Sequence, residues 1–123
     1  MTKLKEKVNQ LNQLIISGNT IKAMEIFYSA DIEMQENEDT PRKGKDVCIE
    51  IEKQHLQKVK KSDCTLLNQA IDSDKNVVFS EWSFVITHKD NTIWLLTEVS
   101  VQYWLNGEVY REKFYYKNLR KAS

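Results

Sequence analysis

The part of the chain that follows Lys61 is strand-like almost throughout, and this feature constrains the fold more than any other. Asn106-Gly107 predicts a two-residue hairpin, because both central positions of a type I′ turn need positive φ. Asp90-Asn91 can form the same kind of turn further upstream. These turns separate segments rich in β-branched and aromatic residues, at 63–71, 76–88, 92–105 and 108–116. The sequence therefore predicts a long antiparallel meander.

The residues before this meander have a helical pattern. Apolar residues recur at a spacing of three to four, and Gly18 is a suitable C-terminal cap for the first helix. A short strand is expected around Ile32, where apolar and polar residues alternate. Helices followed by antiparallel strands are typical of an α+β fold. No linker or repeat interrupts the chain, so we expect one domain over 1–123. Helices are predicted at 3–17, 21–29 and 45–60.

The composition argues against several classes of function. Among the 123 residues, Lys plus Arg and Asp plus Glu number 18 each, so no net charge would attract nucleic acid or an anionic membrane. No apolar run approaches the roughly 20 residues that cross a bilayer, and the N-terminus lacks the pattern of a secretory signal. Cys48 and Cys64 are widely separated and form no ligand cluster with the two histidines. We expect a cytoplasmic protein that needs no metal or cofactor.

The hairpin turns determine which side chains share a face of the meander. Two-residue turns place Val101 opposite Glu112 and Trp82 opposite Val99. If the loop at 90–91 has three residues instead, Glu81 rather than Trp82 points inward. In the two-residue reading, the core face has Glu112 in its middle, Thr97 and His88 nearer its edges, and the following apolar side chains: Trp82, Phe84, Ile86, Ile93, Leu95, Val99, Val101, Tyr103, Tyr110, Phe114 and Tyr116.

The opposite face is too apolar for a fully solvated sheet. The helices are needed on the core face, so a second copy of the chain is expected to cover this one, and we predict a homodimer through the outer sheet face. The apolar residues predicted there are Val77, Phe79, Val85, Trp94, Leu96, Trp104, Val109 and Tyr115.

Two segments give the chain a family resemblance. YSADIEMQEN after the second helix and NGEVYREKFYY near the end, together with three helices and a bent sheet, resemble the nuclear-transport-factor-2-like superfamily, and within it the SnoaL-like, ketosteroid-isomerase-like domains. VVFSEWSFVITHKDN and VSVQYWLNGEVYREKFYY resemble a bacterial branch without an assigned reaction. The resemblance covers nearly the whole chain. It implies a cone-shaped curved antiparallel sheet wrapped around three N-terminal helices, with an apolar pocket at the open end.

The resemblance also implies a candidate base. Aligned without gaps from Tyr28, Glu36 falls on the catalytic carboxylate of the ketosteroid isomerases, and a carboxylate in a dry pocket can move protons near neutrality. Those enzymes stabilise an enolate with a Tyr and a protonated Asp. The first helix here has no tyrosine, and the Asp position falls at Val99 or Ser100. Steroid isomerisation in its familiar form is therefore not expected.

Two hypotheses follow from these residues. In the first, the protein is an enzyme that performs cofactor-independent acid–base chemistry on a small apolar substrate, with Glu36 and Glu112 as catalytic carboxylates. In the second, it is a non-catalytic ligand-binding or dimeric interaction domain, and the carboxylates pair with Arg42, Arg111 or tyrosine hydroxyls in a structural network. The predicted pocket lining is Met34, Trp82, Phe84, His88, Thr97, Val99, Tyr103, Tyr110, Phe114 and Tyr116.

Overall fold

The computed structural model describes residues 3–117 and 119–122, and within them it has three helices and seven strands. The helices are α1 (Lys3–Ile16), α2 (Thr20–Phe27) and α3 (Lys45–Leu56). The strands are β1 (Tyr28–Glu36), β2 (Arg42–Lys43), β3 (Val59–Asp72), β4 (Val77–His88), β5 (Ile93–Leu105), β6 (Glu108–Tyr115) and β7 (Arg120–Lys121). None of the helices in the described part of the chain is long and apolar enough to cross a membrane.

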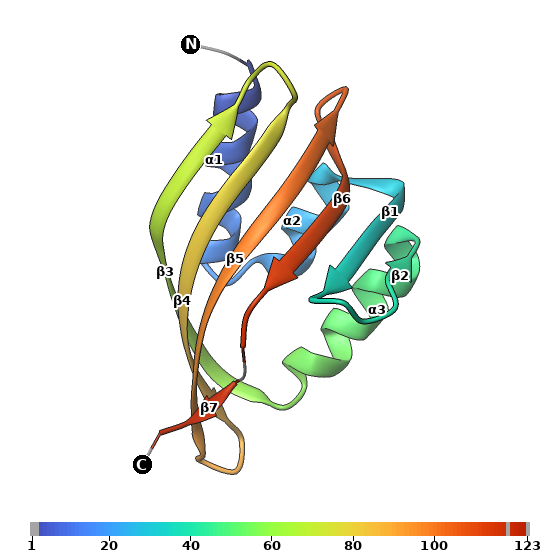
Figure 1. Ribbon diagram of the computed structural model, residues 1–123. Helices are drawn as coiled ribbons and strands as arrows, with labels where there is room; N and C mark the ends of the chain where they lie inside the picture. The colour runs from blue at the N-terminus through green and yellow to red at the C-terminus, as the bar shows by residue number, and fades with distance from the viewer. Residues whose placement is uncertain (1–2, 118, 123) are drawn as a thin grey trace.

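The strands form one strongly curved sheet with the order β2-β1-β6-β5-β4-β3, and β7 pairs with β5. In Figure 1, α1 and α2 lie behind the sheet, and α3 lies beside β1 and β2. The long strands β3 to β6 pair antiparallel, as the sequence predicts, whereas β1 runs parallel to β6. The sheet is not closed on itself, which leaves a cone whose helices cover the inner face. The α+β prediction is confirmed.

The helices begin and end where the sequence predicts within a few residues. Gly18 adopts a φ of +83°, which a left-handed helix cap requires and which glycine adopts without strain. Its backbone N–H donates to the Ile15 carbonyl at 3.1 Å, and the Asn19 N–H donates to the Leu14 carbonyl at 2.7 Å. The chain therefore turns sharply between α1 and α2, and both helices can pack on the same end of the sheet.

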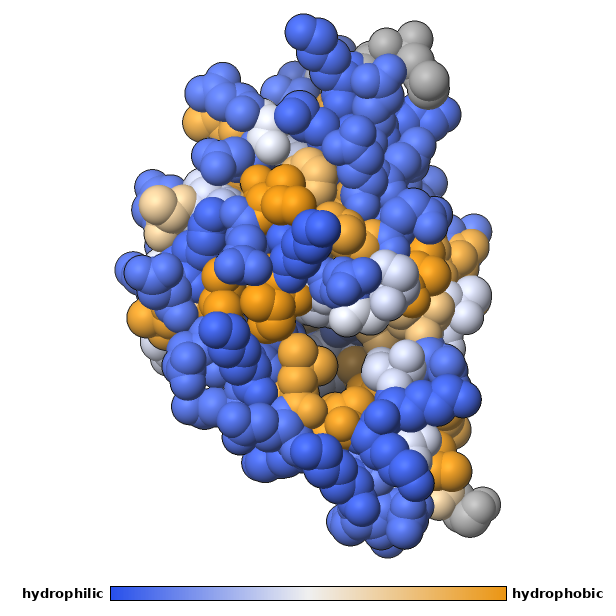
Figure 2. All heavy atoms as spheres, turned by 180° about the vertical axis from the view of Figure 1, so that it is seen from behind, coloured by the Kyte–Doolittle hydropathy of each residue, from blue (hydrophilic) through white to orange (hydrophobic). Residues whose placement is uncertain are grey.

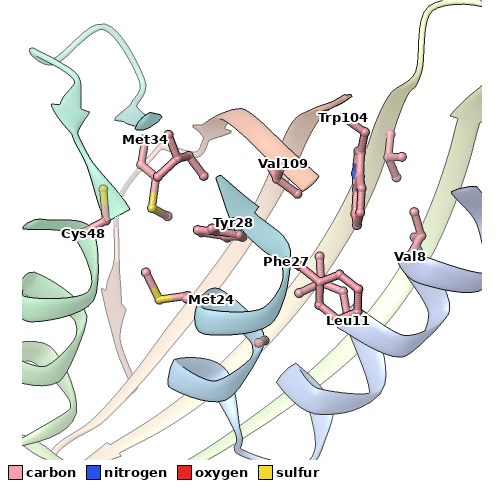
Figure 3. Packing of buried hydrophobic residues seen from close by; sticks show 12 residues of the cluster. Val8, Leu11, Met24, Phe27, Tyr28, Met34, Cys48, Trp104 and Val109 are labelled. Atoms are coloured by element: carbon pink, nitrogen blue, oxygen red, sulfur yellow. The ribbon is translucent and has the colours of Figure 1, made fainter. Parts of the chain in front are cut away.

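The hydrophobic core lies between these two helices and one end of the inner sheet face (Figure 3). Leu11 and Val8 from α1 are fully buried there, together with Val109 from β6. Phe27 packs edge-on against Trp104, with ring centroids 6.0 Å apart and planes inclined by 61°. Burial of large apolar side chains of this kind stabilises the fold by about 1.5–3 kcal/mol each. Apolar side chains therefore fill this end of the cone.

The strand register differs from the prediction at two places, and both move β5. The loop after β4 has three residues, because the His88 N–H donates to the Thr92 carbonyl at 2.9 Å and Asn91 takes a φ of +68°. Trp82 therefore lies opposite Glu98 instead of Val99. A bulge at the other hairpin places Glu112 opposite Gln102. Trp82 and Glu112 point inward as predicted. The expectation that a three-residue loop brings Glu81 inward instead of Trp82 was wrong, because the bulge also turns β5 over.

This reversal exchanges the two faces of β5. The predicted outer residue Trp104 is 3% exposed and belongs to the core, and Val109 is fully buried beside it. The side of the sheet away from the helices is apolar all the same. Exposed hydrophobic side chains there include Phe79, Val99, Tyr110 and Tyr115.

Candidate functional site

The inner face is unusual because its middle is polar. Glu112 of β6 is 3% exposed and lies opposite Met34 of β1 on one side and Gln102 of β5 on the other. The Tyr28 hydroxyl donates a hydrogen bond to Oε1 of Glu112, and the Gln102 amide donates to Oε2 at 2.8 Å. The Trp104 indole N–H donates to Oε1 of Gln102 at 3.2 Å. Both carboxyl oxygens are therefore satisfied, as buried polar groups require.

The titration of this network reflects its burial. Burial raises the pKa of Glu112 to about 7, although the hydrogen bonds from Tyr28 and Gln102 act to lower it. Burial, and then the neighbouring Glu112 carboxyl, raise the pKa of Tyr28 well above its usual value. Tyr28 thus stays a hydroxyl donor, and Glu112 changes its charge near neutral pH.

Glu36, the candidate base from the sequence, lies at the end of β1 and is engaged on both oxygens. Nη2 of Arg42 lies 3.1 Å from its Oε2, and the Tyr116 hydroxyl donates to its Oε1 at 3.3 Å. The Asn37 side chain accepts the Tyr116 backbone N–H at 3.0 Å, which fixes this tyrosine. The Arg42 and Glu36 side chains are 24% and 30% exposed. Glu36 is therefore an ion-paired and partly solvated carboxylate.

Arg42 connects this ion pair to α3. Its carbonyl accepts a weak hydrogen bond from the Cys48 thiol at 3.9 Å, and its Nε is buried without a hydrogen-bond partner among the described residues. Glu52, one turn further along α3, faces the same region. Burial raises its pKa, while His55 and Arg42 act to lower it. Through Glu52, α3 thus adds a carboxyl that faces the sheet near the Glu36–Arg42 pair.

Glu98 is the exception among these carboxyls. It lies on the inner face of β5, opposite Trp82, and is 9% exposed. Within the described part of the chain, no donor hydrogen-bonds to it. Burial, and then the nearby Glu112, Glu36 and Glu52 carboxyls, together raise the pKa of Glu98 to about 8. At neutral pH Glu98 is therefore mostly a neutral acid with an unused donor.

The inner face beyond Glu98 is apolar and only partly covered. Phe84 and Leu96 face each other across β4 and β5, followed by Ile86 and Trp94, and all four are half-buried. Figure 2 shows the helical side of the molecule hollowed at one point between hydrophobic residues. Two surface cavities lie elsewhere, one of about 290 Å³ beside the start of α1 and one of about 200 Å³ on the outer sheet face. An enclosed apolar pocket at the open end remains a prediction.

The predicted site residues divide according to the register. The residues that point into the cone as predicted are Glu36, Glu112, Met34, Trp82, Phe84, Phe114 and Tyr116. His88 lies at the end of β4, where the centroid of its ring is 5.9 Å from that of Trp94. The prediction was wrong about the placement of four others, because β5 is turned over and β6 carries a bulge. These four lie on the outer face: Thr97, Val99, Tyr103 and Tyr110.

The sequence reasoning missed Glu98 and Gln102, because it placed Val99 and Val101 on the inner face and therefore their strand neighbours on the outer one. The three polar residues Glu98, Ser100 and Gln102 alternate with Val99 and Val101 along β5. The rule that apolar residues point inward chose the valines, whereas the structure buries the polar set. Their alignment with Glu112, which is also buried and polar, is the signal that could have revealed them.

Comparisons with known proteins agree with this architecture. No protein family model matches the chain, and no curated protein matches it. Among solved structures, a protein from Mesorhizobium loti provisionally named as a SnoaL-like polyketide cyclase has a TM-score of 0.78 and 20% identity, over 94% of this chain and 100% of that one. An NTF2-like protein of unknown function from Burkholderia pseudomallei has a TM-score of 0.80 at 10% identity, over 95% and 92% of the two chains.

A third structure, from Bacillus subtilis and provisionally named as an isomerase, has a TM-score of 0.79 at 14% identity, over 94% of this chain and 90% of that one. These similarities extend over nearly the whole of each chain. At such low identity they establish the fold and leave the reaction open. The fold expected from the sequence resemblance is confirmed.

Proposed function

We propose that this chain, which has the fold of the SnoaL-like and nuclear-transport-factor-2-like proteins, binds a small, largely apolar molecule in the open half of its cone and performs cofactor-independent proton transfer on it. Glu98 is the proton-carrying group in this proposal. The observation that carries it is a buried carboxyl that has no hydrogen-bond partner among the described residues and lies next to the half-buried apolar pair Phe84 and Leu96 on the inner face. The names of the structural neighbours, which include polyketide cyclases and an isomerase, fit this class of chemistry.

The chemistry follows from the protonation state of Glu98. In its neutral form it can donate a hydrogen bond to a carbonyl oxygen of the bound molecule, and in its ionised form it can take a proton from the carbon next to that carbonyl. A pKa of about 8 keeps both forms accessible near neutral pH. Glu36 as the base is the less favoured version, because Arg42 and Tyr116 already occupy its oxygens. Glu112 has a structural role in this proposal, because Tyr28 and Gln102 already donate to its two oxygens.

The test is proton exchange on ketones. Wild-type protein is incubated in D2O with a panel of cyclic and aryl ketones, and replacement of the α-protons by deuterium is followed by NMR. We expect at least one ketone to exchange faster than in buffer, with a rate that rises as the pH passes through about 8, the pKa of Glu98. Glu98→Gln should reduce the rate to that of buffer. Glu108→Gln, on an exposed residue of β6, is the matched control.

The alternative is a binding domain without catalysis, and the same experiment separates the two. If ketones shift the NMR signals of Phe84 and Trp82 but exchange no faster than in buffer, the protein binds without reacting. If they neither bind nor exchange, the open half of the cone is not a ketone site.

Both described cysteines are unpaired, which supports our proposal of a reducing, cytoplasmic location.

We also propose a homodimer through the outer sheet face. Phe79, Val99 and Tyr110 are exposed on that face, where a second copy would cover them. Light scattering at micromolar concentration should give twice the chain mass, and Phe79→Glu should give monomers. A monomeric wild-type mass would contradict the proposal. Trp104 is unsuitable for this test because it lies in the core.

A further inference from the structure

The interior of the cone contains more acidic than basic groups. The carboxyls of Glu112 (β6), Glu36 (β1) and Glu52 (α3) all act electrostatically on Glu98 of β5, and Glu36 also acts on Glu112 and Glu52. Against these four carboxyls, Arg42 is paired with Glu36 at 3.1 Å. The second basic side chain that acts on this group is His55, which lies beside Glu52 in the last turn of α3.

Glu98 lies where this imbalance is largest. Burial and the carboxyls of Glu112, Glu36 and Glu52 raise the pKa of Glu98, and no positively charged side chain acts to lower it. Tyr116, which also interacts with Glu98, adds a neutral hydroxyl that already donates to Glu36. Glu98 is about nine-tenths buried and, among the described residues, has no hydrogen-bond partner. Among the described residues, this mostly buried side chain has neither a counter-ion nor a hydrogen-bond partner, and its carboxyl oxygens are not among the fully buried unpartnered atoms.

Aromatic rings form the neighbouring wall. Trp82 lies directly opposite Glu98 in the β4–β5 ladder and is 4% exposed. Its ring stacks with that of Phe84 at a centroid distance of 6.1 Å and an angle of 29°. Faces of aromatic rings attract cations, and most strongly so for Trp in a desolvated site. A carboxyl beside an indole is a pair of groups that can bind an organic ammonium ion, through an ion pair and a cation–π contact.

We infer that the ligand of the open half of the cone carries an ammonium group attached to an apolar body, and that this group forms an ion pair with Glu98 beside Trp82. The inference rests on the binding site proposed above and specifies its ligand class. An anionic ligand would meet carboxyl repulsion in the same place. A metal ion is not the expected cation, because no three His, Cys, Asp or Glu side chains in the described part of the chain come together to hold one.

Binding of a cation beside Glu98 has a measurable consequence. Ion pairing favours the charged form of a carboxyl, so the bound ammonium would lower the pKa of Glu98 and release its proton. At pH 7 a group with a pKa of about 8 carries about 0.9 proton, so close to one proton should leave for each ligand bound. A neutral ligand of the same shape would release none.

The experiment compares benzylammonium, benzyl alcohol and benzoate, which share a ring and differ in charge. Calorimetric titration of the whole chain at pH 7, in buffers of different ionisation enthalpy, gives both the affinity and the number of protons released. We expect benzylammonium to bind at least about tenfold more tightly than benzyl alcohol, as a desolvated ion pair beside an indole implies, and benzoate not to bind. Glu98→Gln should remove the preference, while Glu81→Gln on the outer face of β4 should keep it.

The outcomes distinguish this inference from the proposed function. If ketone exchange depends on Glu98 but benzyl alcohol binds as well as benzylammonium, the ammonium inference is wrong and the acid–base proposal stands. If benzylammonium binds through Glu98 while no ketone exchanges, the acid–base proposal is wrong and the ligand class stands. Should Glu98→Gln fail to fold, carboxyl-carbon NMR of the wild type decides instead, because the Glu98 pKa must fall when benzylammonium is added. An unchanged pKa overturns the inference.

Discussion

Glu112 and Glu98 lie on the same inner face of the sheet, on neighbouring strands, and burial raises the pKa of both. Their surroundings differ in one respect. Glu112 lies next to the packed end of the cone, where Tyr28 and Gln102 donate to both of its oxygens. Glu98 lies toward the open end, where no described residue hydrogen-bonds to it. Burial alone therefore does not distinguish a structural carboxyl from one available to a ligand, whereas the state of its hydrogen bonds does.

The largest expected effect comes from the satisfied carboxyl. Glu112→Ala leaves the Tyr28 hydroxyl and the Gln102 amide buried without an acceptor and opens a cavity, so we expect a loss of about 3 kcal/mol of unfolding free energy. Urea denaturation at pH 5, where both buried carboxyls are protonated, measures it. Glu108→Ala, at the exposed start of the same strand, should change stability by less than about 0.5 kcal/mol. A similarly small loss at Glu112 would contradict a structural role.

Replacement of the Glu98 carboxyl should have the opposite effect and stabilise the fold at high pH. Glu98 has an ordinary value of 4.5 when unfolded and a pKa of about 8 when folded. Below pH 4.5 it is protonated in both states, and as the pH rises to about 8 the unfolded chain loses the proton first, which reduces the stability of the fold. Glu98→Gln should therefore have the same stability as the wild type at pH 4 and be more stable than the wild type at pH 8.5.

Urea denaturation as a function of pH tests this prediction. Glu112, whose pKa rises to about 7, has the same sign and contributes to the wild-type loss of stability between pH 4.5 and 7. The comparison with Glu98→Gln removes that shared part. If the variant is less stable than the wild type at both pH values, Glu98 has a partner in solution and is not an unused group.

The same two carboxyls mark the limit of what the sequence could predict. Strand-rich composition, the Asn106-Gly107 turn and the helical spacing were sufficient for the α+β plan, because each is a local signal. Glu112 points inward as predicted, but it does so through a bulge in β6 that the hairpin signal does not contain. Glu98 could not be placed, since that bulge reverses β5 relative to Glu112, and the register of β5 with β4 depends on whether the loop at 89–91 has two or three residues. Asn91 allows both, because it tolerates positive φ.

The second register change was equally hidden from the sequence. The bulge near Tyr110 lets Val109 and Glu112 both point inward although they are three residues apart. No residue in EVYREKF requires a bulge, so the sequence favours strict alternation. The structure compensates by burying Trp104 beside Val109, where it fills the space between β5 and Phe27. The prediction therefore failed where tertiary packing overrides alternation.

Tyr28→Phe tests how the hydrogen bonds hold Glu112, and its effect should be smaller than that of removing the carboxyl. Glu112 keeps its bond from Gln102, so we expect a loss of about 1 kcal/mol. The Tyr28 hydrogen bond lowers the pKa of Glu112, so this pKa should rise in the variant. Carboxyl-carbon NMR measures it, with Tyr110→Phe on the outer face as the matched control. An unchanged pKa would mean that the hydroxyl does not donate to this carboxyl.

The smallest expected effect concerns Glu36, and it separates the two candidate bases. Because the Glu36–Arg42 pair is partly solvated, Glu36→Gln should cost less than about 1 kcal/mol of unfolding free energy. Ketone exchange should persist in this variant, since Glu98 keeps its carboxyl. If Glu36→Gln abolishes exchange while Glu98→Gln preserves it, the base is the ion-paired carboxylate that the family resemblance suggested. The absence of hydrogen bonds at Glu98 would then mark an access path for the substrate, and proton transfer would take place at Glu36 beside Tyr116.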